Sequence, residues 1–175
     1  KIEELVEKLC PAGIEFKALN EVAHLTMGTS PSGSTFSSNP EDGIEFHQGK
    51  TLFGNEIIKR SSIYTTNPIK IAEADSLIMS VRAPVGDTNL TNRKIAIGRG
   101  LCSMVGKNDL LTKFLYYFIN VNIQKIKNKS NGSTFEAINT NDIKQIQIPI
   151  PPLPIQQEIV SILDKFTTLE AELTI

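Results

Sequence analysis

The chain has 175 residues, of which 40% are hydrophobic and 21% are charged, a composition typical of a globular protein of about one domain. Its apolar runs are shorter than the roughly 18 residues of a membrane-spanning helix, and three glutamates among the first ten residues are atypical of a secretory signal peptide. The two cysteines are far apart and lack metal-ligand spacing, so we expect a reduced, cytoplasmic protein that does not contact a membrane.

The charges are unevenly distributed, although the net charge is only −1. Residues 81–144 hold 10 basic and 4 acidic side chains, a net charge of +6, whereas residues 1–80 carry −4 and residues 145–175 carry −3. A basic middle between acidic ends fits a surface that binds a polyanion. It fits equally well an ordinary solvated surface on which charges cluster by chance.

The N-terminal part is predicted to hold one short helix, one strand and a long loop. Apolar residues recur at helical intervals over residues 2–9, and the sequence Cys-Pro-Ala-Gly ends this helix because proline cannot continue it. Residues 14–18 alternate between apolar and polar, as a strand does. Residues 26–43 are rich in Ser, Thr, Gly, Pro and Asn, which predicts a loop, and a loop of this length usually has a functional role.

The middle of the chain is predicted to be mainly β-structure, with tight turns at glycines. Strand patterns occur at residues 44–46, 76–81, 94–98 and 101–106. These segments alternate with turn sequences and are too short for helices.

A helix is predicted for residues 108–127, where Asn108 can cap the first turn and leucine and phenylalanine side chains form a broad apolar face. A short capped turn is predicted for residues 139–143 and a last strand for residues 145–150. Pro149 places that strand at the edge or the end of a sheet, because proline cannot donate a hydrogen bond to a neighbouring strand.

Residues 148–166, IPIPPLPIQQEIVSILDKF, join a proline-rich spacer to a helical pattern. The prolines end the sheet, and Pro154 suits the first position of a helix. Apolar residues then recur at alternating intervals of four and three, which is the seam of a coiled coil. This seam consists of Ile155, Ile159, Ile162, Phe166, Leu169 and Leu173. An isolated helix of this length is marginal in water, so we expect it to pack against another long helix or against its own globular part.

No catalytic or metal-binding pattern is recognisable in the sequence. His24 and His47 are the only histidines, and neither has a second ligand at metal-binding spacing. The segment from Gly43 to Thr51 does not match a phosphate-binding loop, because Gly43 lies one position too far from Gly49. A nucleophile elbow is also absent. We therefore expect no metal, no cofactor and no catalytic residues.

The remaining polar residues suit the binding of DNA. Lysine can neutralise phosphates, arginine can bind guanine through two parallel hydrogen bonds, and Asn, Ser and Thr can bind phosphate oxygens or base edges. Each of these residues could equally be an ordinary surface side chain. The predicted DNA-binding residues are Arg82, Arg93, Lys94, Arg99, Lys125, Lys127, Lys129, Ser130, Asn131, Ser133 and Thr134.

Three stretches, in this order, resemble the specificity subunits of type I restriction-modification systems. The first is EKLCPAGIEFKALNEVA (residues 7–23), which is similar to the family's entry segment. The second is LIMSVRAPVGDTNLTNRKIAIGRGLCSM (residues 77–104), with a Val-Gly corner and a strand that follows Gly-Arg-Gly. The third is NGSTFEAINTNDIKQIQIPIPPLPIQQEIVSILDKF (residues 131–166), with the Gly-Ser turn, the Ile-Pro strand, Pro-Pro-Leu and the helix that follows.

The resemblance implies a mixed α/β (α+β) target recognition domain with a β-rich core, residues 1–153, and a long coiled-coil-forming helix, residues 154–175. In this family two such domains each read one half of a split double-stranded DNA sequence, and the subunit itself is not catalytic. Modification subunits dock on it and methylate adenine with S-adenosylmethionine, and restriction subunits join to cleave. With one recognition domain, this chain is expected to be half of a longer subunit or a half-size subunit that forms a homodimer. The alternative is an adaptor that docks an enzyme through its helix without contacting DNA.

Overall fold

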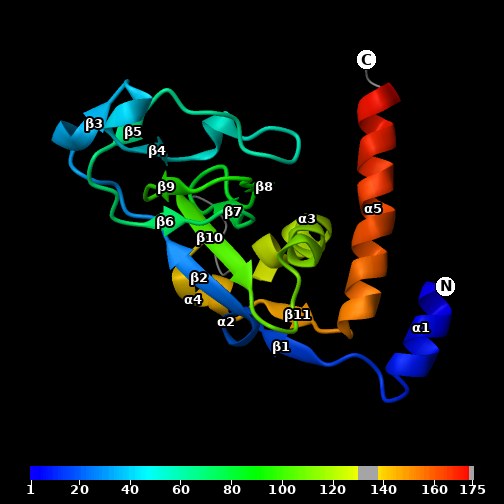
Figure 1. Ribbon diagram of the computed structural model, residues 1–175. Coiled ribbons are helices and arrows are strands. Elements are labelled where there is room, and N and C mark those ends of the chain that lie inside the picture. The colour runs from blue at the N-terminus through cyan, green and yellow to red at the C-terminus, as the bar shows by residue number, and fades with distance from the viewer. Residues whose placement is uncertain (130–137, 174–175) are drawn as a thin grey trace.

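The computed structural model describes residues 1–129 and 138–173, with the backbone alone for residues 125–129 and 170–171. Three small sheets form a β-rich body, which carries the helix α3 (Thr112–Lys129). The long helix α5 (Leu153–Leu173) stands beside this body, and its C-terminal half extends away from it (Figure 1). The predicted mixed α/β class with a C-terminal helix is therefore confirmed.

The larger hydrophobic core lies between α3 and a four-stranded antiparallel sheet of order β2-β10-β7-β8. The strands are β2 (Ala23–Met27), β10 (Leu101–Gly106), β7 (Leu77–Ser80) and β8 (Thr88–Leu90). Leu115 and Ile119 of α3 are fully buried together with Met79 and Met104 of the sheet. The strands predicted at residues 76–81 and 101–106 are confirmed.

The second sheet has the order β3-β5-β4-β9-β6 and includes one parallel pair, β4 with β9. Its strands are β3 (Phe36–Ser37), β5 (Tyr64–Thr65), β4 (Ile44–His47), β9 (Ile95–Ile97) and β6 (Ile71–Ala72). A smaller core, which includes Ile58, Ile78 and Ile97, holds this sheet against the first one. The segment predicted as one loop, residues 26–43, is shorter than expected, because β2 extends to Met27 and β3 forms within it.

A third sheet, of two strands, lies near the start of α5 (Figure 1). Its strands β1 (Phe16–Ala18) and β11 (Gln147–Pro149) are antiparallel, with Lys17 opposite Ile148. This confirms the predicted last strand and its place at an edge. The short helices α2 (Leu19–Val22) and α4 (Thr140–Lys144) lie next to it, and the side chain of Asn139 caps α4 by accepting a hydrogen bond from the backbone N–H of Asp142 at 2.9 Å.

One glutamine fixes the start of α5 to the start of α3. Gln156 is fully buried, and its Oε1 accepts a hydrogen bond from the backbone N–H of Leu111 at 2.9 Å. Its Nε2 donates to the carbonyl oxygens of Asp109 and Pro151, each at 2.7 Å. Helix α3 begins at Thr112 and not at the predicted Asn108, and residues 107–110 form a turn in which the Leu110 N–H donates to the Lys107 carbonyl at 2.9 Å.

A second polar contact holds α5 two turns further along. The Tyr117 hydroxyl donates to Asp164 Oδ1 at 2.5 Å, and Lys113 Nζ lies 2.9 Å from the same oxygen and 3.0 Å from Glu56 Oε1. Two separate points on α5 are thus bound, one to the segment just before α3 and one to α3 itself. The direction of α5 relative to the β-rich body is fixed by side chains of both helices.

The predicted seam of α5 is divided into a covered half and an open half. The helix α1 (Ile2–Leu9) lies against the lower half of α5, and Lys1 Nζ pairs with Glu158 at 2.7 Å (Figure 1). Ile155 is buried and Ile159 packs against the larger core. Both residues thus serve packing within this chain, which corrects the expectation that they pair with a separate helix.

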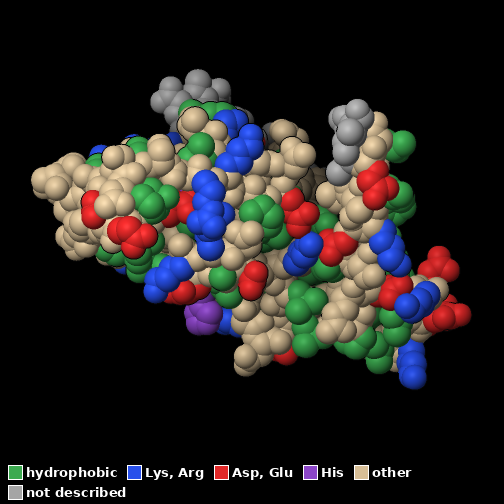
Figure 2. All heavy atoms as spheres, turned by 45° about the horizontal axis from the view of Figure 1, so that its top comes forward, with side chains coloured by type: hydrophobic (Ala, Val, Ile, Leu, Met, Phe, Trp, Pro, Cys, Tyr) green, Lys and Arg blue, Asp and Glu red, His purple; other side chains and the backbone are tan. Residues whose placement is uncertain are grey.

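The open half of the seam lies beyond α1. Phe166, Leu169 and Leu173 are 60%, 53% and 87% exposed, and Ile162, one turn before them, is half-buried. Figure 2 shows hydrophobic side chains along the outer edge of the projecting helix. An apolar edge of this kind is costly in water and suits a partner helix.

Candidate nucleic-acid interface

The ends of three strands meet at a small basic cavity. It is lined by Gln48, Gly49 and Lys50 after β4, by Ser80, Arg82 and Ala83 at the end of β7, and by Arg99 and Gly100 between β9 and β10. Its volume is about 150 Å³. The backbone joins these segments directly, because the Gly98 N–H donates to the His47 carbonyl at 2.7 Å and the Val81 N–H donates to the Gly100 carbonyl at 2.9 Å.

Glycine at position 98 allows these segments to approach one another. A Cβ atom there would lie 2.8 Å from Phe46 Cζ and 3.0 Å from both Gln48 Cγ and Ser30 Oγ. These distances are shorter than ordinary van der Waals contact. The Gly-Arg-Gly turn of the sequence therefore serves close packing, and it presents the Arg99 side chain beside Gln48.

Ser30 holds Gln48 and Arg99 together. The Ser30 hydroxyl donates to Gln48 Oε1 at 3.1 Å and accepts a hydrogen bond from the Arg99 backbone N–H at 3.3 Å. With Oε1 bound in this way, the Gln48 amide turns its Nε2, which carries two N–H donors, away from Ser30. The segment of residues 26–43 thus contributes to the site through one positioning side chain.

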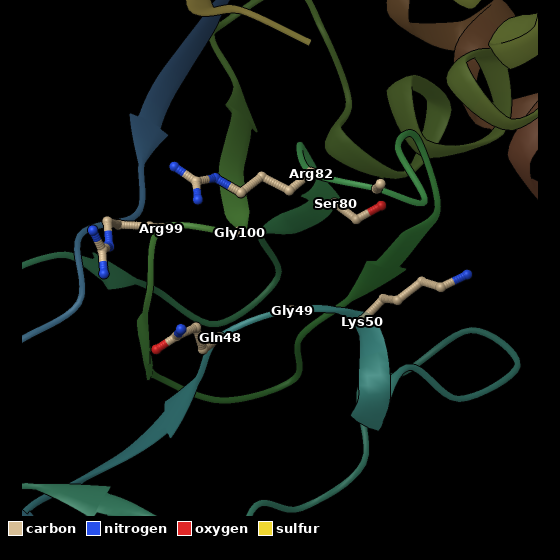
Figure 3. A pocket seen from close by; sticks show the side chains of 8 residues that line it. Gln48, Gly49, Lys50, Ser80, Arg82, Arg99 and Gly100 are labelled. Atoms are coloured by element: carbon tan, nitrogen blue, oxygen red, sulfur yellow. The ribbon is translucent and has the colours of Figure 1, made fainter. Parts of the chain in front are cut away.

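Three cationic side chains line the cavity, and they differ in whether they form an ion pair. Lys50 Nζ pairs with Asp87, whereas Arg82 and Arg99 are exposed and form no ion pair within the described part of the chain. In Figure 3 the side chains of Arg82, Arg99 and Gln48 extend to one side of the cavity, and Lys50 extends to the opposite side. On the face drawn in Figure 2, Lys and Arg side chains form a run across the β-rich body. The local charge favours an anionic ligand.

Strand β4, which leads into the cavity, also carries one residue of a buried ion pair that the sequence patterns did not identify. Glu45 in β4 is 5% exposed, and the Arg93 side chain is 15% exposed. Arg93 Nε donates to Glu45 Oε2 at 2.8 Å, and one of its Nη atoms donates to Glu45 Oε1 at 2.6 Å. Two parallel bonds of this kind are the strongest form of an arginine–carboxylate pair.

Arg93 is therefore removed from the predicted DNA contacts. Its remaining N–H groups donate to the carbonyl oxygens of Ile58 and Lys59 and to the side chain of Asn92, at 2.9–3.1 Å. All five N–H donors of the guanidinium group have partners inside the chain. A phosphate or a base could bind Arg93 only by breaking this packing.

The environment of Glu45 holds it ionised. Burial alone would raise its pKa, but hydrogen bonds from Arg93, from the Ser61 backbone and from His47 outweigh this and hold the pKa at about 2. His47 Nε2 donates to Glu45 Oε1 at 2.8 Å, while burial lowers the pKa of His47. His47 is thus a neutral structural residue, and its buried Nδ1 has no partner among the described residues.

Among the other predicted site residues, only Lys94 has a described side chain. Lys94 is exposed and 3.5 Å from Glu73, away from the cavity. Lys125, Lys127 and Lys129 lie on the last turns of α3, where only the backbone is described. Ser130, Asn131, Ser133 and Thr134 lie outside the described residues. Of the predicted DNA-binding residues, the structure brings together Arg82 and Arg99, and it adds Gln48, Lys50 and Ser30.

Residues 1–129 and 138–173 lack two other classes of feature. These residues include no group of three or more His, Cys, Asp or Glu side chains that could hold a metal ion. No helix in this part of the chain is both long and apolar enough to cross a membrane.

Known proteins match nearly the whole chain. The family model of the type I restriction modification DNA specificity domain matches residues 11–175. The MjaX type I restriction enzyme specificity subunit of Methanocaldococcus jannaschii is 38% identical over 136 residues, which are 77% of this chain and 32% of that protein.

Two solved structures are similar as well. A chain from a type I R-M system, solved to explain its complex assembly and conformational transition, has a TM-score of 0.84 at 32% identity, over 98% of this chain and 44% of that one. The HsdS subunit of Thermoanaerobacter tengcongensis has a TM-score of 0.81 at 30% identity, over 99% and 44%. The chain thus spans less than half the length of each of these relatives.

Proposed function

Because the chain belongs to the family of type I restriction modification DNA specificity domains, we propose that it reads one half of a bipartite double-stranded DNA target. In this proposal residues 1–153 form the recognition domain and residues 154–175 form the helix that sets its place in the complex. The observation that carries the proposal is the basic cavity, where Arg82 and Arg99 are exposed and Gln48 is held in one orientation. Arginine bonded to guanine and glutamine bonded to adenine are characteristic base contacts in the major groove.

The partners follow from the family and from the open apolar edge of α5. Modification (methyltransferase) subunits and restriction subunits would dock on the chain, which itself supplies recognition and no catalysis. A second recognition domain, in a longer subunit or in a homodimer, would pair with Phe166, Leu169 and Leu173. Two rigidly joined domains would read half-sites at a fixed separation.

The first prediction concerns DNA affinity. In the complex assembled with modification subunits, Arg82→Ala and Arg99→Ala are each expected to weaken binding of the cognate duplex by about 1–3 kcal/mol. Affinity of the unchanged complex should fall steeply with salt, because each neutralised phosphate lowers the logarithm of the association constant by about 0.9 per tenfold increase in salt. Fluorescence anisotropy at several salt concentrations measures both quantities.

Lys8→Ala on α1 is the matched control, because it removes one exposed cation far from the cavity (Figure 1). It should leave the affinity unchanged. If both arginine variants bind as Lys8→Ala does, and the affinity of the unchanged complex does not depend on salt, the chain does not read DNA. The result would then favour the adaptor that only docks an enzyme.

The second prediction concerns the open half of the seam. Leu169→Asp is expected to abolish pairing of the chain with a second helix, because a charge would replace an apolar side chain at the centre of the exposed edge. Light scattering of the chain alone and of its mixture with modification subunits measures the assembled mass. Ser161→Asp, which places the same charge at an exposed position of α5 outside the apolar seam, should keep the mass of the unchanged chain. Equal masses for the two variants would refute this use of the edge.

A further inference from the structure

The basic cavity offers hydrogen-bond donors and almost no free side-chain acceptors. Gln48 Oε1 is bound by Ser30, and Ser80 Oγ donates to the Pro84 carbonyl at 2.9 Å and accepts from the Asp87 N–H at 3.0 Å. What remains for a ligand is Gln48 Nε2 and the guanidinium groups of Arg82 and Arg99. The side chains of the cavity therefore select a ligand edge that consists of acceptors.

Among the base edges in the major groove, only guanine presents two adjacent acceptors, O6 and N7. Adenine has an acceptor beside an amino group, cytosine has an amino group, and thymine has one acceptor beside a methyl group. The amino groups of adenine and cytosine would find only the second lone pair of Gln48 Oε1, because Ser30 occupies the first. An amino group that is left unpaired costs about 1–3 kcal/mol, which gives the cavity a preference for guanine.

A backbone phosphate also presents only acceptors, but this turn is poorly suited to it. Phosphate sites at glycine-rich turns use free backbone N–H groups. Here the N–H groups of Gly98, Arg99 and Leu101 donate to the His47 carbonyl, to Ser30 Oγ and to the Gly98 carbonyl, respectively. The Gly100 N–H and the side chains at the rim are the donors that remain, so most of the backbone N–H groups of this turn are not available to a phosphate.

We propose that Arg99 and Gln48 donate to O6 and N7 of one guanine in the half-site, with Ser30 as the residue that positions both. This inference rests on the proposed function and adds a sequence preference to it. In the cavity view the side chains of Arg99, Gln48 and Arg82 extend to the same side (Figure 3), and Ser30 binds both Gln48 and the backbone of Arg99. The half-site is therefore expected to contain a G·C pair that depends on these two side chains.

The test uses the complex assembled with modification subunits. Its target is first identified by sequencing the methylated positions in DNA that it has modified. Duplexes of this target are then made with 7-deazaguanine, which lacks the N7 acceptor, at each guanine of the half-site in turn. One such substitution should weaken binding by about 10-fold, the effect of losing one base contact. The same substitution should have little further effect on Arg99→Ala or Gln48→Ala.

The methylated sequence gives an independent reading. Arg99→Ala and Gln48→Ala should relax the target at the same guanine, Ser30→Ala should relax it partly at that position, and Lys70→Ala, an exposed cation outside the cavity, should leave the target intact. Gln48→Glu should disfavour guanine, because it replaces the N–H donors with a carboxylate acceptor.

Two results would overturn the inference. One is a uniform loss of affinity in the variants with an unchanged target, which would mean a phosphate contact. The other is relaxation by Arg99→Ala and Gln48→Ala at different positions, or at an A·T pair. If the wild-type complex methylates a defined target and both variants still methylate that same target, the guanine site is refuted and the proposed function stands. A wild-type complex that binds no duplex refutes the proposed function itself.

Discussion

Arg93→Ala is expected to lower the free energy of unfolding by about 3–5 kcal/mol, the cost of leaving one charge of a buried ion pair without its partner. Glu45 is 5% exposed, and Arg93 supplies two of its hydrogen bonds. The carbonyl oxygens of Ile58 and Lys59 would lose a donor as well. Unfolding by urea, followed by circular dichroism, measures the change.

Arg60→Ala provides the control on the same carboxylate. Arg60 lies 3.2 Å from Glu45 Oε2, but its side chain is 76% exposed, so the loss should be at most about 1 kcal/mol. If Arg93→Ala costs no more than Arg60→Ala, the pair does not stabilise the fold as described, and Arg93 becomes a candidate for DNA contact again.

The same ion pair predicts a dependence on pH. The pKa of Glu45 in the folded chain is about 2, below its ordinary value of 4.5, so the stabilisation is complete above pH 4.5 and is lost as the pH falls towards 2. In Arg93→Ala this pKa should rise. The difference in stability between the two proteins should therefore be constant above about pH 5 and shrink below it.

The elements that were predicted correctly are those with local periodic patterns. Strands β7 and β10 and helices α3 and α5 each carry enough apolar residues to reveal their period. Strands such as β5 and β6 have two residues each, and they exist because distant segments pair with them. No local pattern reports such pairing, so these strands were missed.

The candidate site was predicted in part, for a related reason. Arg82 and Arg99 stood out because they flank turns in a basic stretch. Arg93 lies in the same stretch, but its partner Glu45 is 48 residues earlier in the sequence, so its charge pattern could not reveal the ion pair. Gln48 was missed because a single polar residue after a strand carries no signal until Ser30 and Arg99 are placed beside it.

The seam of α5 shows how a correct periodicity can give an incomplete assignment. The intervals of four and three identified the apolar face, and they are the same in both halves of the helix. Only the fold distinguishes Ile155, which is buried within the chain, from Leu169, which is exposed. The position of α1 beside the first half makes this difference.

Gln156→Leu is expected to lower the free energy of unfolding by about 2–4 kcal/mol, because it leaves buried backbone groups without partners. The Leu111 N–H would lose its acceptor, and the carbonyl oxygen of Pro151 would lose a donor in a buried place. The Asp109 carbonyl lies nearer the surface and can turn to water. Urea unfolding measures the total, and hydrogen exchange at the Leu111 amide should accelerate when its acceptor is removed.

Gln157→Leu is the matched control, since the same side chain at the next position is exposed. It should change stability by less than about 0.5 kcal/mol. Equal losses in the two variants, or unchanged exchange at Leu111 in Gln156→Leu, would contradict the role assigned to Gln156.

The functional consequence of Gln156→Leu follows from the two points that bind α5 to α3. With the first point removed, the Asp164 contacts with Tyr117 and Lys113 would be the remaining polar link between α5 and α3, and the direction of the helix relative to the β-rich body would be held less tightly. If α5 sets the distance between half-sites, the assembled complex should then methylate targets over a wider range of spacings, while the half-site sequence stays the same. Methylation of a duplex library with the spacer varied one base pair at a time measures this range. An unchanged range, in a variant that has lost stability, would show that partner subunits and not Gln156 fix the direction of the helix.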